Sequence, residues 1–173
     1  VKSLVRLRQL KQLKSMNLDH IQVSDDEFRY ISGLKNLKSL SLERSSISDE
    51  GLKYLEGLDQ LEELNLKETK VEGPGFIHLK KLEKLKVLHM PNQVRGSGLE
   101  HLAGLKKLSR LDLRFTKVDG PGLKHLSKFH YLEDLSLDPQ LVEGRSLTHL
   151  SGLKRLKILN LRNMKVSDQD LKA

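Results

Sequence analysis

Histidines recur at a regular interval in the sequence and are the first candidates for chemistry. The same place in a repeated pattern is occupied by Tyr30, Tyr54, His78, His101, His125 and His149. Imidazoles bind metal ions and titrate near neutral pH, so a metal site and a pH-dependent switch are both hypotheses. Metal ligands converge on one point, whereas these residues are expected to form a line. We therefore interpret the series as structural, within a repeated phrase Gly-Leu-Lys-His-Leu, and predict no metal site.

Residue patterns typical of catalysis are absent from the sequence. It contains no Gly-x-Ser-x-Gly, His-Glu-x-x-His, Gly-x-Gly-x-x-Gly or phosphate-loop Gly-Lys-Ser/Thr pattern. Glu62 and Glu63 are adjacent in an expected strand, so their carboxylates point to opposite sides and cannot act together. The chain has no Cys, which excludes disulfides and thiol chemistry. We predict that the protein is not an enzyme and needs no cofactor.

Composition sets limits on the core and on partners. Only 4% of the 173 residues are aromatic and none is Trp, so Leu must supply most of the buried surface. The 31 Lys and Arg exceed the 23 Asp and Glu by 8, which permits an acidic partner without requiring one. No apolar run approaches the ~18 residues that could span a bilayer, so no transmembrane segment is predicted. Cytoplasmic and secreted locations both fit a soluble chain of this composition.

Leucines return at a fixed interval along the whole chain. The spacings are 24, 24, 24, 23, 24 and 24 residues in the series Leu13, Leu37, Leu61, Leu85, Leu108, Leu132 and Leu156. If each of these leucines is position 1, positions 4 and 6 hold Leu or Met and position 11 holds Val or Ile, one place early in the short unit. Positions 16 and 19 hold Leu, Phe or Ile. A period of this length indicates a solenoid whose units bury their apolar residues against each other.

Each unit changes its apolar period from two to three. Positions 4 and 6 alternate with polar residues, as in LKSLSLE, which predicts a short half-buried strand. Positions 16, 19 and 22 are apolar, as in GLKYLEGL, which predicts one face of a short helix. Pro74 and Pro121 suit a first helical turn, and Ser48 and Asp49 are candidate caps for the helix that follows them.

These residues carry a family resemblance. The order L-x-x-L-x-L, a β-branched residue and then G-L-x-x-L resembles the leucine-rich repeat family over essentially the whole chain. The 24-residue length and the phrase T-K-V-x-G-x-G-L-K-H-L are similar to bacterial repeats related to the ribonuclease-inhibitor-like subclass. The resemblance implies an α/β solenoid, a curved horseshoe arc with a parallel sheet on its concave face and short helices on its convex face. Family members commonly carry Asn at position 9. We expect no unbroken Asn ladder here, because that position holds Ile21, Ser45, Thr69, Thr116 and Met164.

The repeat predicts a single domain of stacked units. Residues 1–12 and 156–173 are incomplete units, and the full units are 13–36, 37–60, 61–84, 85–107, 108–131 and 132–155. Solenoids normally carry polar caps at their ends, and neither end shows one. We therefore expect the domain to belong to a longer protein or to self-associate through its ends.

Positions 3, 5 and 7 predict one exposed face of the sheet, because they alternate with buried positions 4 and 6. Side chains at the same position of adjacent strands are expected to lie side by side. One interpretation is a solvated face whose charges satisfy each other, through the pairs Glu43–Lys67, Arg110–Asp134 and Arg114–Asp138–Arg162.

The other interpretation of this face is a partner-binding patch. Two irregular stretches, HMPNQV in the short unit and Asp138-Pro139 in a later one, flank a predicted exposed aromatic, Phe115. Aromatic and Arg side chains are favoured at protein interfaces. The predicted patch consists of Asn65, His89, Arg110, Asp112, Arg114, Phe115 and Ser136.

Basic residues collect in the loop from each helix to the next strand, at positions 23, 24 and 2. Eleven Lys or Arg lie there against four Asp or Glu. Such cations can simply complement helix C-termini and keep the protein in solution, or they can dock an anionic surface. The candidate basic edge consists of Lys84, Lys86, Lys106, Lys107, Lys154, Arg155 and Lys157.

Three functional hypotheses follow from the sequence. The first is a non-catalytic scaffold, such as a bacterial adaptor or effector, that binds a protein or peptide on the concave sheet. The second is electrostatic docking of the basic edge to an acidic partner, lipid or nucleic acid. The third is a structural spacer or self-assembly segment. The first is favoured, because residue types repeat at the core positions and vary at the surface positions, which leaves the surface free to serve binding.

Overall fold

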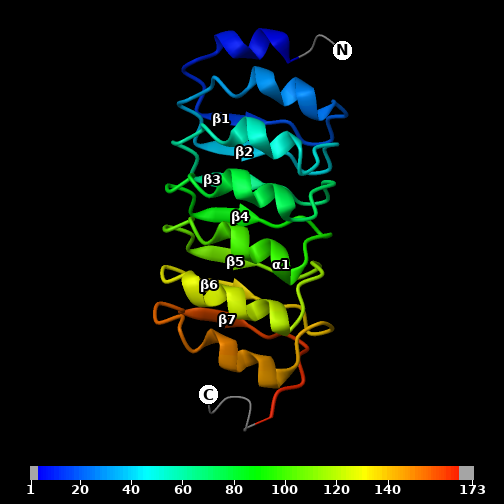
Figure 1. Cartoon of the computed structure of the whole chain (residues 1–173), viewed down its shortest axis with the longest axis vertical. Helices are drawn as coiled ribbons and strands as arrows, with labels where there is room; N and C mark the ends of the chain where they lie inside the picture. The colour runs from blue at the N-terminus through cyan, green and yellow to red at the C-terminus, as the bar shows by residue number, and fades with distance from the viewer. Residues whose placement is uncertain (1–3, 168–173) are drawn as a thin grey trace.

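Seven short strands form one parallel sheet that follows the order of the chain. The computed structural model describes residues 4–167. The strands are β1 (Ser15–Asn17), β2 (Ser39–Ser41), β3 (Glu63–Asn65), β4 (Val87–His89), β5 (Arg110–Asp112), β6 (Asp134–Ser136) and β7 (Ile158–Asn160). Each strand pairs only with its neighbours in sequence, in the order β1-β2-β3-β4-β5-β6-β7. Figure 1 shows the strands stacked in one column, with the two ends of the chain at opposite ends of the column.

The strand register places equal repeat positions side by side. Ser39 pairs with Glu63, and Glu63 pairs with Val87, all at position 3. The one-residue-short unit keeps this register, because Val87 pairs with Arg110. A slip of one residue would turn every position-4 leucine outward, so burial specifies the register strongly. The predicted α/β leucine-rich repeat solenoid is confirmed.

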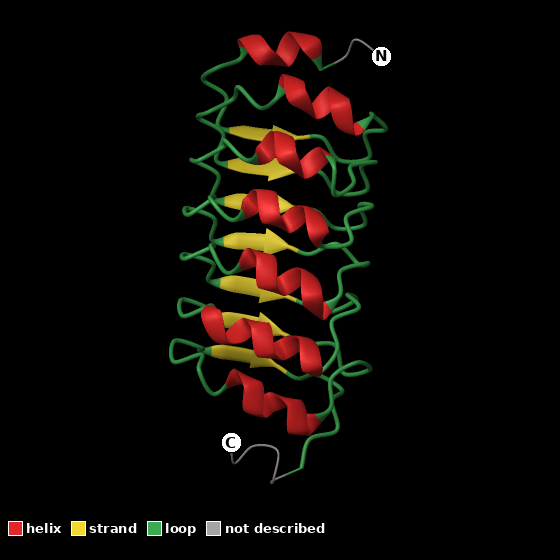
Figure 2. Cartoon of the chain, in the orientation of Figure 1, coloured by secondary structure: helices red, strands yellow, loops and turns green. Residues whose placement is uncertain are grey.

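Short helices cover one side of this sheet (Figure 2). Six of the units contribute 3₁₀ helices and one contributes a four-residue α-helix continued by a 3₁₀ turn. Their bounds are η1 (Val5–Gln9), η2 (Asp25–Tyr30), η3 (Gly51–Leu55), η4 (Pro74–Leu79), α1 (Gly96–Leu99), η5 (Glu100–Leu102), η6 (Pro121–Lys128) and η7 (Gly144–Leu150). An apolar residue at every third position matches the three residues per turn of a 3₁₀ helix, which explains this preference. Pro74 and Pro121 begin η4 and η6, as predicted.

A continuous apolar core fills the space between the sheet and the helices. Leu40, Leu64, Leu88, Leu111 and Leu135, all at position 4, are at most 1% exposed. The core residues of the outermost described units pack less completely, since Leu159 at the same position is 37% exposed. Each fully buried leucine contributes about 1.5–3 kcal/mol to folding.

In two units the residue at position 9 is Thr, and its hydroxyl bonds to the backbone at the place where Asn was expected from the resemblance. Thr69 Oγ1 donates to the carbonyl of Leu66 at 2.8 Å, and Thr116 Oγ1 donates to that of Leu113 at 2.7 Å. Both hydroxyls are buried, whereas the Ser45 hydroxyl at the same position has no hydrogen-bond partner within residues 4–167. Each Thr therefore closes its own turn and makes no ladder to the neighbouring unit.

Two aspartates at position 13 fasten adjacent units together. Asp25 accepts bonds from the Ser48 backbone N–H at 2.9 Å and from its hydroxyl at 2.5 Å. The prediction that Asp49 caps its own helix is wrong, because η3 begins after Glu50 without a side-chain cap. Asp49 instead reaches the start of η4, where it accepts backbone N–H bonds of 2.7–3.1 Å from Glu72, Gly73 and Gly75.

The described part of the chain contains no helix long and apolar enough to cross a membrane. Residues 1–3 and 168–173, which the predicted first and last units include, lie outside the described residues. The predicted division into units stays a prediction.

Replacing Asp49 should destabilise the protein, since the carboxylate satisfies three backbone donors of the next unit. We expect Asp49→Ala to lower the free energy of unfolding by about 1–3 kcal/mol, the usual cost of losing a charged acceptor. Urea unfolding followed by circular dichroism measures this change. The matched control is Glu50→Ala, which should have little effect, and equal unfolding midpoints for the two variants would contradict the assigned role of Asp49.

Candidate partner-binding surfaces

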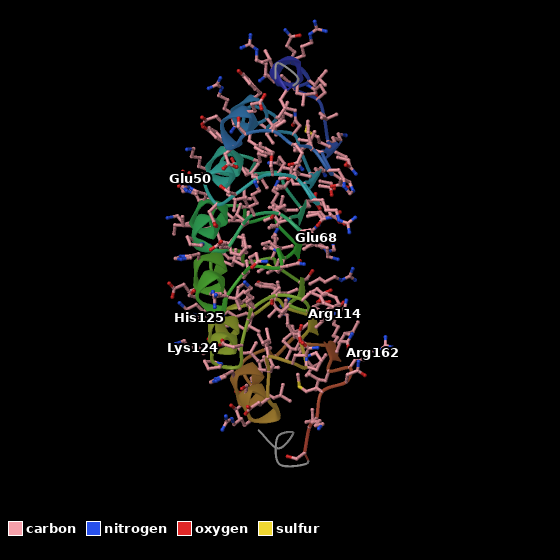
Figure 3. The ribbon with its side chains drawn as sticks, turned by 90° about the vertical axis from the view of Figure 1, so that its right-hand side faces the viewer. Glu50, Glu68, Arg114, Lys124, His125 and Arg162 are labelled. Atoms are coloured by element: carbon pink, nitrogen blue, oxygen red, sulfur yellow. The ribbon has the colours of Figure 1, made fainter. Side chains whose placement is uncertain are left out.

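The sheet face is the outward side of the strands, opposite the helices. In Figure 3, Glu68 and Arg114 lie on the strand side of the molecule and Lys124 and His125 lie on the helix side. Residues at positions 3 and 5 of each strand point from this face, because position 4 lies between them and points into the core.

Two adjacent hollows lie on the sheet face, in the units that contain β2 to β6. The first, which we call the sheet hollow, has a volume of about 190 Å³ and includes five of the seven predicted patch residues, His89, Arg110, Asp112, Arg114 and Ser136. The second, the rim hollow, has a volume of about 360 Å³ and is lined by Asp112, Arg114 and Phe115 together with Glu43, Lys67, Glu68, Met90 and Asn92. The structure therefore brings six of the seven predicted residues together.

Asn65, the seventh patch residue, lies outside both hollows. Its side-chain amide donates to the Ser41 hydroxyl at 3.2 Å and to the Glu43 carboxylate at 3.0 Å. Ser136 lines the sheet hollow but is only 9% exposed, so its predicted exposure is wrong. Asn65 and Ser136 therefore offer little accessible surface to a partner within the hollows.

Arg114 and Asp112 form the tightest ion pair of the sheet hollow. Arg114 Nε donates to Asp112 Oδ1 at 2.9 Å, and its Nη2 donates to Oδ2 at 2.7 Å. Burial alone would raise the pKa of Asp112, but the side-chain and backbone hydrogen bonds from Arg114 outweigh it and hold that pKa below its usual value. Asp112 is therefore ionised at neutral pH. Arg114 still has the N–H groups of Nη1 available, because a guanidinium carries five donors.

The pairs expected along the rows form only in part. Arg110 Nε lies 3.1 Å from Asp134 Oδ2, as predicted. The predicted Arg114–Asp138 pair is replaced by Arg114–Asp112 within one strand and turn. The predicted Glu43–Lys67 pair does not form either, because Glu43 accepts the Asn65 amide. Arg114 thus pairs with position 5 of its own strand, and Glu43 bonds to position 5 of the next strand, so in both cases a position-5 residue replaces the expected position-7 partner.

Lys67 is a patch residue that the sequence analysis missed. It lines both the sheet hollow and the rim hollow, and among the described residues it makes no ion pair within 4.0 Å. The sequence placed it at position 7 of the face, but it was expected to be paired with Glu43 and was therefore left out of the patch. Lys67 thus places a cation at the junction of the two hollows, close enough to Asp112 to help lower the pKa of that carboxyl.

Phe115 is the largest exposed aromatic surface of the described chain, with 74% of its area accessible. Its φ is +63°, in the left-handed region that bulky residues avoid. Position 8 has positive φ in four other units, at His20, Arg44, Glu68 and Asn163. In these five units the turn after the strand adopts this conformation at its third residue, as a type II turn does. Phe is thus doubly unfavourable at position 115, by exposure and by backbone conformation.

The neighbouring irregular unit supports the Phe115 turn. Pro139 occupies position 8 there, and proline cannot adopt a positive φ, so the turn shifts and Leu141 donates its N–H to the Asp138 carbonyl at 3.4 Å. The Asp138 carboxylate is thereby placed to accept the Phe115 backbone N–H at 3.0 Å and that of Gln140 at 2.9 Å. Such support is what strained residues need to persist.

Much of the charge on the basic edge is neutralised locally. Glu62 lies 2.6 Å from Lys86 and 3.1 Å from Lys38. Lys106 pairs with Glu83 at 3.4 Å, and Lys157 pairs with Glu133 at 2.9 Å. The edge is therefore an alternation of cations and carboxylates over most of its length.

The remaining predicted residues of the basic edge have other neighbours or none. Lys84 donates to the Gln60 side-chain carbonyl at 2.6 Å, and the Arg155 guanidinium lies 4.4 Å from the centre of the Tyr131 ring. Among the described residues, Lys107 and Lys154 make no ion pair within 4.0 Å. Positive charge is consequently concentrated around Tyr131.

The histidine series lies along the helices. His78 Nδ1 is 3.6 Å from Glu56, and His101 Nε2 is 3.9 Å from Glu100. Within residues 4–167, no group of three His, Cys, Asp or Glu side chains is arranged to hold a metal ion.

Replacing Phe115 with a residue that tolerates positive φ should stabilise the protein. Asn adopts the left-handed region readily, so we expect Phe115→Asn to raise the free energy of unfolding by about 0.5–1 kcal/mol. Urea unfolding measures this change in the free energy of unfolding. The control is His20→Asn, which makes the same replacement at the equivalent position, where the residue is already polar. A loss of stability in Phe115→Asn would show that the Phe side chain contributes to folding.

The Glu62 ion pairs should make stability depend on acid pH. Hydrogen bonds from Lys86 and Lys38 lower the pKa of Glu62 to about 2. Because the folded pKa lies below the unfolded value, this stabilisation is present above roughly pH 4.3 and is lost as the pH falls toward the folded pKa. Urea midpoints should therefore favour the wild type over Glu62→Gln at pH 5, and the difference should shrink by pH 2.5. A difference that is constant with pH would contradict the assignment.

Comparisons with known proteins bear on the fold. No protein-family model matches the chain, and no curated protein does. Two similar solved structures are internalins from Listeria monocytogenes. For InlF the TM-score is 0.63 at 18% identity, covering 95% of this chain and 52% of that one. For InlC2 the TM-score is 0.61 at 25% identity, covering 76% of this chain and 54% of that one.

A third similar structure is the plant peptide hormone receptor RGFR1 in complex with RGF2. Its TM-score is 0.57 at 21% identity, covering 87% of this chain and 24% of the receptor chain. The chain thus spans about half or less of the length of these proteins. Together with the register and the stacked core, the likeness shows that the chain has the leucine-rich repeat fold.

Proposed function

We propose that the chain is a non-catalytic module that binds a protein or peptide on its sheet face between β3 and β6. The observation that carries this proposal is Phe115, which is 74% exposed and holds a left-handed backbone conformation. The repeat turn accounts for the backbone conformation, whereas an exposed aromatic side chain in that conformation is unfavourable for folding, so a role outside the folded chain accounts for the Phe. Exposed aromatic residues beside arginines are typical anchors of protein interfaces.

The surroundings of Phe115 support the same proposal. Arg114 and Lys67 line the rim hollow with it, and Arg110 lies in the neighbouring sheet hollow with 62% of its side chain exposed. A partner can place an apolar group against Phe115 and an acidic group near Lys67. The RGFR1 structure supports the idea by likeness, since that receptor of similar fold is in complex with RGF2.

The basic edge and the spacer role are the alternative proposals. Docking of the basic edge to lipid or nucleic acid is less favoured, because Glu62, Glu83 and Glu133 neutralise much of its charge. Self-association through the ends is suggested by Leu159, a leucine at core position 4 that is 37% exposed on the last described strand.

Loss of partner binding in a stable variant tests the proposal. The variant Arg110→Gln, Arg114→Gln, Phe115→Asn removes the charges and the aromatic ring while leaving a residue suited to the turn. Partners enriched from lysates of the source cells at ~0.5 M salt, where exposed charge interactions are screened, should be lost by this variant. They should be kept by the matched control Arg6→Gln, Arg8→Gln, His20→Asn.

Equal recovery by both variants would place the function elsewhere. Recovery that depends on low salt alone would favour the basic edge. Sedimentation of the same preparations reports self-association, which would favour the spacer role.

A further inference from the structure

A third hollow, with a distinct chemical character, lies at the basic edge, where η5 and η6 end. Its volume is about 580 Å³, and Ala103, Lys106, Lys107, Lys128, His130 and Tyr131 line it together with Glu83. We call it the edge hollow. It shares no lining residue with the sheet hollow or the rim hollow, so an inference about it is independent of the proposed function.

The floor of the edge hollow is apolar and aromatic. Tyr131 is 46% exposed, and Ala103 lies beside it. The methylene stems of Lys106, Lys107 and Lys128 extend this apolar surface, because long cationic side chains cover it while their charged ends stay in water. A volume of this size accommodates one or two side chains of a partner.

The rim of the edge hollow is strongly positive. Lys106 is balanced by Glu83 at 3.4 Å, but Lys107 and Lys128 make no ion pair within 4.0 Å among the described residues. Arg155 adds a further charge where it stacks on the Tyr131 ring at 4.4 Å. This excess of cations over one carboxylate contrasts with the part of the edge where Lys38, Lys86 and Lys157 lie beside carboxylates.

We propose that the edge hollow binds an acidic protein segment that carries an apolar side chain. The apolar side chain would lie against Tyr131 and Ala103, and flanking Asp or Glu would pair with Lys107 and Lys128. Complementary charge raises the rate of encounter and excludes basic partners. The hollow is thus a second docking site, on a different surface from the sheet face.

Two other anionic partners fit this surface less well. A bilayer contacts a broad area, whereas Lys38, Lys86 and Lys157 on the rest of the edge are held by carboxylates. Nucleobases need aromatic platforms for stacking. Among the described residues that line the edge hollow, Tyr131 is the only Phe, Tyr or Trp, and Arg155 already covers one face of its ring.

Fluorescence anisotropy with defined peptides tests this proposal. The probe is a short synthetic peptide in which a central Phe is flanked on both sides by Asp and Glu, and its control has Asn and Gln in place of the acids. The acidic peptide should bind and the amide peptide should not. We expect Lys107→Glu with Lys128→Glu to weaken binding by about tenfold or more, and Tyr131→Ala to weaken it several-fold.

Two matched controls make the result specific. Lys14→Glu with Lys70→Glu changes the net charge equally at exposed, distant positions and should keep the affinity. The variant of Arg110, Arg114 and Phe115 should keep it as well, which separates this site from the proposed function. Failure of the acidic peptide to bind, or equal losses in the edge variant and the Lys14/Lys70 control, would overturn the proposal. Stronger binding to phosphatidylserine vesicles or to single-stranded RNA than to the peptide would also overturn it.

Discussion

The structure depends on one constraint: no unit can bury its leucines without the unit beside it. A strand of three residues and a helix of one or two turns have too little surface to form a core alone. Leu64, for example, is fully buried only because units on both sides cover it. The same contact aligns the strands, since a slip of one residue from the observed register would turn the apolar residues outward.

This dependence explains why the fold was predictable from the sequence. The spacing of leucines specifies which residues face inward, and the parallel pairing in sequence order follows from it. The type of helix was harder to predict from the sequence. An apolar residue at every third position fits both a short α-helix and a 3₁₀ helix, and six units adopt the tighter form. The inter-unit role of Asp49 was missed. An Asp just before a helix has the same sequence pattern whether it caps that helix or bonds to the next unit.

The candidate site was predicted in outline, and the misses have a common cause. Position numbers place His89, Arg110 and Phe115 on the correct face, but they do not say which neighbour each charge selects. Arg114 pairs with Asp112, two residues away, and so leaves Asp138 to hold the Phe115 backbone. Glu43 bonds to Asn65, which leaves Lys67 without an ion pair in the described part of the chain. Choices between nearby partners depend on side-chain geometry that repeat spacing does not contain.

The tolerance of the 23-residue unit has a consequence for how such a surface can change. The unit loses its residue in the loop after β4, yet β4 and β5 pair in the common register. Length variation is thus absorbed in that loop, while duplication or removal of a whole unit moves a side chain along the sheet by one strand width, about 4.8 Å. Recognition in this fold can therefore evolve along two separate coordinates: coarse steps by copying units, and local reshaping in the loops beside the strands.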